Sequence, residues 1–195
     1  MKKMLPQFLA AALALVAAVS LFALEAKPEA VPAPAPDITR LLADFRTNIP
    51  GIFTSGSWQG RLALSSSGFV VQGNKGADGK GEMGQNLAPP SDLSKETFIE
   101  LAIGVGAKNE VPEVTIGFTD AGGIQYATRI RISQVLPQQA VWFRVKRSDF
   151  KLNDWQGLHA GKSIDWTRIT QWHLQGDWAT VAPFHVMFIA LRTRQ

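Results

Sequence analysis

The chain has 195 residues, of which 46% are hydrophobic and 18% charged, and this corresponds to one globular domain. It contains no cysteine, which excludes disulfide bonds, thiolate catalysis, cysteine-ligated zinc and attachment of a lipid through cysteine. The 20 basic and 16 acidic residues give a net charge of +4, an excess too small to require a nucleic-acid partner.

The N-terminus has the layout of a secretory signal peptide. Lys2 and Lys3 precede an uncharged apolar run over residues 8–24, and Ala26 is the candidate cleavage position. We therefore predict a signal peptide over 1–26 and an exported protein, periplasmic or extracellular. The apolar run is at the short limit for a membrane-spanning helix, so an uncleaved anchor is the alternative.

A spacer follows the apolar run. Residues 27–37, KPEAVPAPAPD, contain four prolines and predict a stiff, extended linker that packs no core. We place the folded domain at 38–195. Its first residues have helical spacing at Ile38, Leu41, Leu42 and Phe45, and both a short helix and an irregular first strand remain open there.

From residue 57 onward the hydrophobic pattern has a period of two, which is typical of strands with one buried face. The clearest alternating runs are 98–105, 113–119, 124–132 and 141–146. Further runs are 58–64, 68–73, 169–174 and 183–192. About eight strands at this spacing predict an all-β antiparallel sandwich.

Four short motifs follow one another in a familiar order. They are Asp-Leu-Ser at 92–94, Thr-Asp-Ala-Gly-Gly at 119–123, Ser-Asp-Phe at 148–150 and Asp-Trp-Thr-Arg-Ile at 165–169. Over residues 90–192 the chain resembles the galactose-binding-like jelly roll of carbohydrate-binding modules and of relatives of a complex I assembly factor. The resemblance implies a jelly-roll sandwich that binds carbohydrate without catalysis. Such modules often end Ile-Asp-x-Ile, whereas this chain has Val-Met-Phe-Ile at 186–189, so the last strand lacks the carboxylate for a calcium or ligand role.

The candidate catalytic and metal motifs are weak. Residues 79–84 match GxGxxG, but no strand precedes them and no helix follows, so we predict a flexible glycine-rich loop. Asp78, Glu82 and Asp120 are possible structural calcium ligands, although solvated loop carboxylates are favoured, and no other cofactor is expected. The three histidines lack zinc-site spacing. A glycan-cleaving enzyme is the least favoured class, because the strand phases offer only Glu100 and Glu113 as acids.

Tryptophan and arginine side chains form the predicted ligand site. Trp142 is out of phase with its apolar neighbours, and we expect it to share a face with Arg144 and, across the preceding hairpin, with Arg129, Arg131 and Gln125. An indole platform with guanidinium and amide donors suits a sugar ring. The alternative is that Trp142 covers an exposed sheet face or packs under the N-terminal segment, while the arginines pair with Glu100 and Glu113.

The other tryptophans are assigned from their surroundings in the sequence. Trp172 is in phase with an apolar strand face and is predicted to lie in the core, whereas Trp58, Trp155 and Trp178 lie in or beside loop-like sequence and suggest a second site at the rim. The favoured function is an exported carbohydrate-binding module without nucleic-acid partners. The alternative is a structural or protein-interaction domain of the bacterial cell envelope.

Overall fold

The computed structural model describes residues 39–47, 49–59, 66–154, 157–178 and 182–195. The predicted signal peptide and linker lie outside the described residues. No helix within the described ranges is long and apolar enough to span a membrane.

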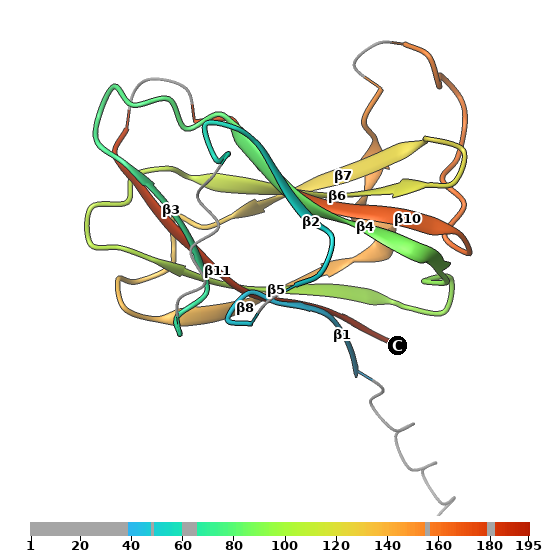
Figure 1. Ribbon diagram of the computed structural model, residues 1–195, viewed down its shortest axis with the longest axis horizontal. Helices are drawn as coiled ribbons and strands as arrows, with labels where there is room; N and C mark the ends of the chain where they lie inside the picture. The colour runs from blue at the N-terminus through green and yellow to red at the C-terminus, as the bar shows by residue number, and fades with distance from the viewer. Residues whose placement is uncertain (1–38, 48, 60–65, 155–156, 179–181) are drawn as a thin grey trace, which may run out of the picture. The chain divides into compact units, whose positions relative to one another are not determined.

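The described residues form eleven strands arranged in two antiparallel sheets (Figure 1). The five-stranded sheet contains β1 (Thr39–Asp44), β3 (Phe69–Gly73), β5 (Phe98–Val105), β8 (Ala140–Lys146) and β11 (Phe184–Arg194). The six-stranded sheet contains β2 (Ile52–Gly56), β4 (Gly81–Ser91), β6 (Glu113–Asp120), β7 (Gln125–Arg131), β9 (Lys151–Leu152) and β10 (Ile169–Gly176). The predicted all-β antiparallel sandwich is confirmed.

The order of strands in each sheet differs from their order in the chain. In the five-stranded sheet β11 pairs with β5 on one side and with both β1 and β3 on the other, and β8 follows β5. The six-stranded sheet runs β2-β4-β10-β6-β7-β9. The chain therefore crosses repeatedly between the layers, and a short 3-10 turn at Arg147–Asp149 makes one such crossing, from β8 to β9.

Several sequence expectations change at the start of the domain. The segment with helical spacing forms strand β1. The predicted strand at 58–64 is not formed at its start, because Trp58 and Gln59 lie in a turn; the rest of that run from residue 60 lies outside the described residues. The predicted glycine-rich loop at 79–84 is wrong for its second half, since Gly81–Gly84 begin the long strand β4.

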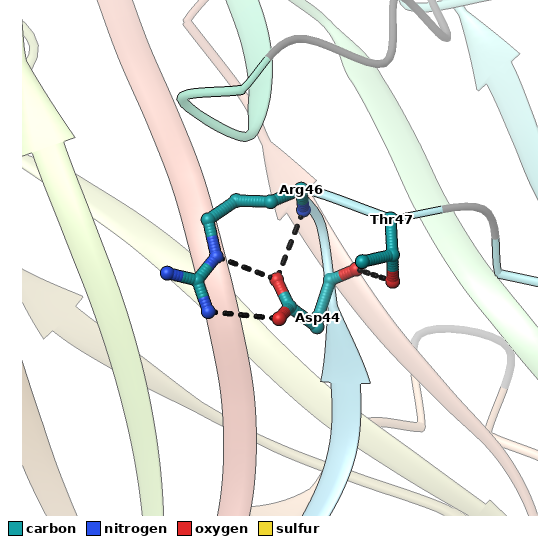
Figure 2. A network of polar contacts seen from close by, with 3 residues as sticks. All are labelled: Asp44, Arg46 and Thr47. Atoms are coloured by element: carbon teal, nitrogen blue, oxygen red, sulfur yellow. Dashed lines mark hydrogen bonds and ion pairs between the residues drawn. The ribbon is translucent and has the colours of Figure 1, made fainter.

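A charged turn ends β1 and directs the chain toward the other sheet (Figure 2). The Asp44 carboxylate accepts hydrogen bonds from Nε and Nη2 of Arg46, each at 2.8 Å, and the hydroxyl of Thr47 donates to the backbone carbonyl of Asp44 at 3.0 Å. The hydrogen bond from the Arg46 side chain holds the pKa of the Asp44 carboxyl below its usual value. These contacts fix the turn locally.

Aromatic rings fill the space between the sheets. At one end the fully buried Trp58 packs against Phe69, Trp178 and Phe188, with ring centroids 5.5–6.3 Å apart. At the other end Phe118 and Trp166 pack at 5.6 Å. Trp172 is buried in the core, as predicted. Such rings bury large apolar areas and hold the two sheets together.

Candidate functional site

The outer face of the six-stranded sheet carries a continuous set of polar side chains. Along β6, β7 and β10, residues that enter the core alternate with residues that face outward. The strand registers place the outward residues in rows that cross β4, β10, β6 and β7. We call this surface the polar face, and its side chains are Glu82, Asn86, Thr115, Thr119, Gln125, Gln171, His173 and Gln175.

The middle row of the polar face places a histidine between two glycines. His173 of β10 lies opposite Gly84 of β4 and Gly117 of β6. A Cβ atom built on Gly117 would lie 2.1 Å from Nε2 of His173, and one on Gly84 would lie 2.7 Å from Cζ of Phe53. The imidazole and the phenyl ring therefore each cover a glycine of a neighbouring strand. A larger residue at Gly117 would displace the imidazole, and one at Gly84 would collide with both the phenyl ring and the backbone oxygen of Trp172 at 2.5 Å.

Amide side chains lie beside this row and are linked to it. The Gln125 amide lies 2.9 Å from Nε2 of His173, and its own oxygen accepts from the Asn153 amide at 2.9 Å. In the same row as Gln125, the Gln171 amide donates to the side-chain oxygen of Asn86 at 3.0 Å. These bonds fix the amide orientations before any ligand arrives, which lowers the entropy lost on binding.

Burial decides the protonation of His173. Its surroundings lower the pKa of the imidazole to about 4 because the charged form is desolvated. The ring is therefore neutral at physiological pH, and the ring nitrogen that faces the Gln125 amide accepts a hydrogen bond from it. The histidine positions the glutamine without adding charge to the polar face.

On the other side of the histidine row lies a carboxyl group. Glu82 of β4 lies between Ser55 of β2 and Gln175 of β10, and both neighbours hydrogen-bond its side chain. Burial raises the pKa of Glu82, and the two hydrogen bonds partly oppose that effect. The group is held in place by neutral partners and accepts or donates according to its protonation.

A cavity of about 320 Å³ opens at this end of the polar face. Its polar lining includes the Arg129 guanidinium, which pairs with the Glu113 carboxylate at 3.0 Å. Its apolar lining includes Trp178, whose indole N–H donates to the backbone carbonyl of Glu113 at 2.7 Å. Polar groups in front of an apolar wall are typical of a ligand pocket. The remaining lining residues are Val111, Pro112, Thr115, Gln175, Asp177 and Ala182.

The structure divides the predicted site between the two sheets. Gln125, Arg129 and Arg131 are on β7, facing outward from the six-stranded sheet. Trp142 and Arg144 are on β8, facing outward from the five-stranded sheet. The expectation of one shared face is wrong, because β7 and β8 are not a hairpin: the connection between them carries the chain to the other sheet. The binding role of each residue stays a prediction.

The alternative pairing of the arginines is what the structure shows. Arg144 Nε donates to Oε1 of Glu100 at 2.7 Å, and Arg129 pairs with Glu113. Trp142 is 44% exposed, and one face of its indole is covered by the guanidinium of Arg192, whose Cζ lies 3.8 Å from the ring centroid. Part of the indole remains accessible away from this contact.

The candidate calcium ligands are not brought together. Glu82 lies opposite Gln175 near one end of β10, whereas Asp120 lies opposite Ile169 at the other. The Asp120 carboxylate instead accepts backbone N–H bonds at 2.8–2.9 Å from Gly122, Ile124 and Asp165. Within the described ranges no three His, Cys, Asp or Glu residues are grouped as a metal site.

The predicted rim site of tryptophans is also corrected. Trp58 and Trp178 are buried in the core, and Trp155 lies outside the described residues. Trp58 looked loop-like because it lies in a turn, but its ring enters the sandwich beside Gly81 and Gly176, where a Cβ atom would collide with it. The alternating hydrophobic pattern that identifies strands does not predict that a side chain in a turn is buried.

Sequence reasoning missed most of the polar face. His173 and Gln171 alternate with the buried Trp172 and Leu174, and that alternation was the available signal. It shows that these side chains face outward, but not that β4 lies beside them. Asn86 could be placed on the polar face only once the pairing of β4 with β10 was known.

Comparison with known proteins bears on the fold. No protein-family model matches the sequence, and no curated protein matches it. Solved structures do match. A family 11 carbohydrate-binding module from Clostridium thermocellum, in complex with a β-1,3-1,4-mixed-linked tetrasaccharide, has a TM-score of 0.55 at 16% identity, covering 80% of this chain and 94% of the module. The chain has the fold of these modules.

Two further matches agree with this. The family 11 module of the cellulosomal cellulase Lic26A-Cel5E of Clostridium thermocellum has a TM-score of 0.54 at 16% identity, covering 80% of this chain and 93% of that chain. An agarase, AgWH50C, has a TM-score of 0.57 at 13% identity and covers 80% of this chain. This match covers 24% of the agarase, so the chain corresponds to a minor part of that enzyme.

Proposed function

We propose that the chain is an exported, non-catalytic carbohydrate-binding module that holds a glycan on the polar face. The observation that carries the proposal is the set of amide and hydroxyl side chains on the outer sheet face, prearranged by their own hydrogen bonds and by the buried His173 imidazole beneath Gln125. Aromatic contact comes from Phe53, which is half-buried and covers Gly84 beside the histidine row. The fold shared with carbohydrate-binding modules supports the same class of function.

The chemistry of this face suits a neutral sugar chain. A sugar hydroxyl both donates and accepts, and the side-chain amides of Gln171 and Gln125 offer both kinds of group. Neighbouring strands lie about 4.8 Å apart, so polar groups recur across the sheet at a spacing comparable with the length of one sugar ring. The ligand class we propose is a neutral polysaccharide chain that lies across β4, β10, β6 and β7.

The absence of catalysis is part of the proposal and rests on the two candidate acids. A glycosidase places two carboxyl groups on either side of one bond. Glu100 faces outward from the five-stranded sheet and Glu113 from the six-stranded sheet, so these two groups cannot act at a common bond. Each is also paired with an arginine guanidinium. Burial alone would raise the pKa of Glu100, but the hydrogen bonds from Arg144 and Arg192 lower it, which opposes a role as a proton donor.

Binding is tested by calorimetry of the purified full-length chain with barley mixed-linked β-glucan, laminarin and agarose oligosaccharides. We expect binding to at least one neutral glycan, a loss of at least tenfold in affinity for Gln171→Ala, and no change for Leu41→Ala on the exposed far side of β1. Release of reducing ends is expected to stay at the background rate. The variants are checked for folding by circular dichroism.

Three results overturn the proposal. Absence of binding to every glycan leaves the structural or protein-interaction role in the envelope. Binding that survives Gln171→Ala but is lost in Trp142→Ala moves the glycan to the five-stranded sheet. Cleavage of the glycan by the purified chain makes it an enzyme.

Export is supported by the sequence of the N-terminus. Lys2 and Lys3 before the apolar run of residues 8–24 are what a secretion signal requires. N-terminal sequencing of the protein from the envelope or medium of its host is expected to start at residue 27. A chain that begins at Met1 and fractionates with the cytosol contradicts export, and one that begins at Met1 in the membrane fraction supports the anchored alternative.

A further inference from the structure

The outer face of the five-stranded sheet has a different chemistry from the polar face. At its centre lies Glu100 of β5, whose side chain is 2% exposed although it points away from the core. Arg144 Nε donates to its Oε1 at 2.7 Å and Arg192 Nε to its Oε2 at 2.6 Å, while Arg194 Nη1 lies 3.6 Å from Oε1. We call these three arginines the arginine cluster.

The carboxylate holds the arginines by one side of each guanidinium. Burial would raise the pKa of Glu100, but hydrogen bonds and charges from Arg144 and Arg192 outweigh burial and lower it, so the group is ionised. Both short bonds use Nε, and the Arg144 side chain remains 47% exposed. The Arg144 guanidinium lies over the Phe98 ring, with Cζ 5.1 Å from the ring centroid, and its terminal N–H groups are not used by the bond to Glu100. Their fork geometry matches carboxylate, sulfate and phosphate groups.

The charge of this face is unbalanced. Lys146 of β8 lies next to the arginine cluster, opposite Phe98 of β5. The arginine cluster and Lys146 thus supply four cationic groups against the Glu100 carboxylate, and Asp44 of β1, on the same face, is paired with Arg46. A buried carboxylate that fixes several cations leaves a net positive field outside it, and such a field attracts anions.

An indole lies directly beside the cluster. Trp142 of β8 lies opposite Ala102 of β5, whereas Arg192 of β11 lies opposite Glu100, the neighbouring outward residue of β5. The Arg192 guanidinium lies 3.8 Å from the indole centroid, so the two side chains meet over β5, where the outward Ala102 is buried. Trp142 is thus held by Arg192 with 44% of its surface exposed, and Arg144 is the next outward residue along β8.

We propose that this face is a second binding site, for the carboxylate or sulfate groups of an acidic polysaccharide. The guanidinium of Arg144 binds the anionic group, and the accessible part of the Trp142 indole contacts the sugar ring. A neutral glycan does not fit as well, because it offers no charge to repay the desolvation of several cations. The site is separate from the polar face and does not depend on glycan binding there.

A glycan fits the geometry better than a membrane surface does. The indole lies along a strand face between β8 and β11, rather than at a loop tip from which it would insert among lipids. An extended sheet surface with one flat ring and neighbouring forked donors matches the alternating ring and charged group of a polyuronate. Anionic lipid and single-stranded DNA are therefore the competitors that the test must separate.

The test measures binding of the full-length chain to polygalacturonate at an ionic strength of about 0.1 M. The matched neutral control is fully methyl-esterified polygalacturonate. We expect at least tenfold weaker binding to the esterified polymer and at least tenfold weaker binding of Arg144→Gln to the acid polymer. Trp142→Ala is expected to weaken binding, and Arg144→Lys to fall between wild type and Arg144→Gln. Lys75→Gln removes the same charge from an exposed turn and is expected to change affinity less than twofold.

Four results would contradict a binding site at Arg144 and Trp142. Equal losses for Lys75→Gln and Arg144→Gln assign the binding to overall charge and overturn the site. Absence of binding to polygalacturonate, or equal binding to its ester, also overturns it. So does Arg144-dependent binding to anionic phospholipid vesicles or to a thymidine oligonucleotide in place of the acid polymer. Loss of mixed-linked glucan binding in Gln171→Ala bears on the polar face alone, so failure of one site is distinguishable from failure of the other.

Discussion

A single buried imidazole orders the polar face at the scale of individual residues. His173 is fully buried although it lies on the outer side of its sheet, because Gly117 leaves room for the ring and the Gln125 amide closes over it. A charged ring there would be desolvated without a carboxylate partner among its hydrogen-bond neighbours. The neutral form is what the fold stabilises.

The unfolding free energy is therefore expected to decrease as the pH is lowered through the range in which His173 titrates. Its pKa is lowered from 6.5 to about 4 in the folded chain, so between these values the unfolded chain binds more protons. Stability is full above pH 6.5 and falls progressively as the pH drops to about 4, by up to about 3 kcal/mol. Urea denaturation between pH 7.5 and 4.5 measures this loss. The His173→Gln variant measures the pH dependence that comes from the carboxylates alone. If the unfolding free energy has the same slope against pH in the variant and in the wild type, His173 does not contribute.

Gly117 is predicted to be required for the same packing. A Cβ atom in Gly117→Ala would lie 2.1 Å from a ring that is enclosed on all sides, and we expect a loss of about 1–3 kcal/mol in unfolding free energy. In Gly104→Ala the new Cβ meets the mobile end of Met187 at 2.7 Å, and we expect a smaller loss. The denaturation midpoints of the two variants measure this difference. A loss of stability in Gly104→Ala equal to or larger than that in Gly117→Ala would contradict the packing of His173 against Gly117.

At the scale of strands, alternation was readable from sequence and sheet membership was not. The alternating runs that became β5, β6, β7 and β8 were predicted, because one side of each enters the core. The consecutive runs β7 and β8 looked like a hairpin, but nothing in their residues encodes that the chain changes sheet between them. That one missing fact placed Trp142 and Arg129 on a common face.

Strand β4 was missed for a physical reason connected with the site. Its outward residues Glu82, Gly84 and Asn86 are polar or small because they belong to the polar face, and of its inward residues Gln85 is also polar. That glutamine is accommodated by a hydrogen bond from Trp172 Nε1 at 3.1 Å. A strand without alternating apolar residues resembles a loop in sequence, so β4 was not predicted although it contributes to the polar face.

The turn that carries Trp58 is predicted to be essential for the sandwich. Its ring is fully buried among Phe69, Trp178 and Phe188, so Trp58→Ala removes a large apolar contact and is expected to cost about 3–5 kcal/mol. Leu158→Ala, at a 65% exposed position, is expected to change stability by less than about 0.5 kcal/mol. Thermal and urea unfolding of both variants compare them, and a Trp58 variant as stable as the Leu158 variant would place the indole outside the core.

At the scale of the whole sandwich, the two outer faces are built from opposite kinds of polar group. The six-stranded sheet presents amides that bond one another, with Glu82 and the Arg129–Glu113 ion pair at one end. The five-stranded sheet presents guanidinium groups fixed by one carboxylate. Neutral groups bind hydroxyls through directional hydrogen bonds that salt affects little, whereas the cationic face acts through charge and is screened by salt. The two surfaces are therefore expected to differ in the ligands that they bind and in the salt dependence of that binding.

The most direct measurement of the central claim is an amide chemical-shift titration of the full-length chain with a β-1,3-1,4-mixed-linked tetrasaccharide. The account predicts that the perturbed amides lie on β4, β6, β7 and β10, around His173 and Gln171. Perturbations confined to β5, β8 and β11, or none at saturating sugar, would contradict glycan binding on the polar face.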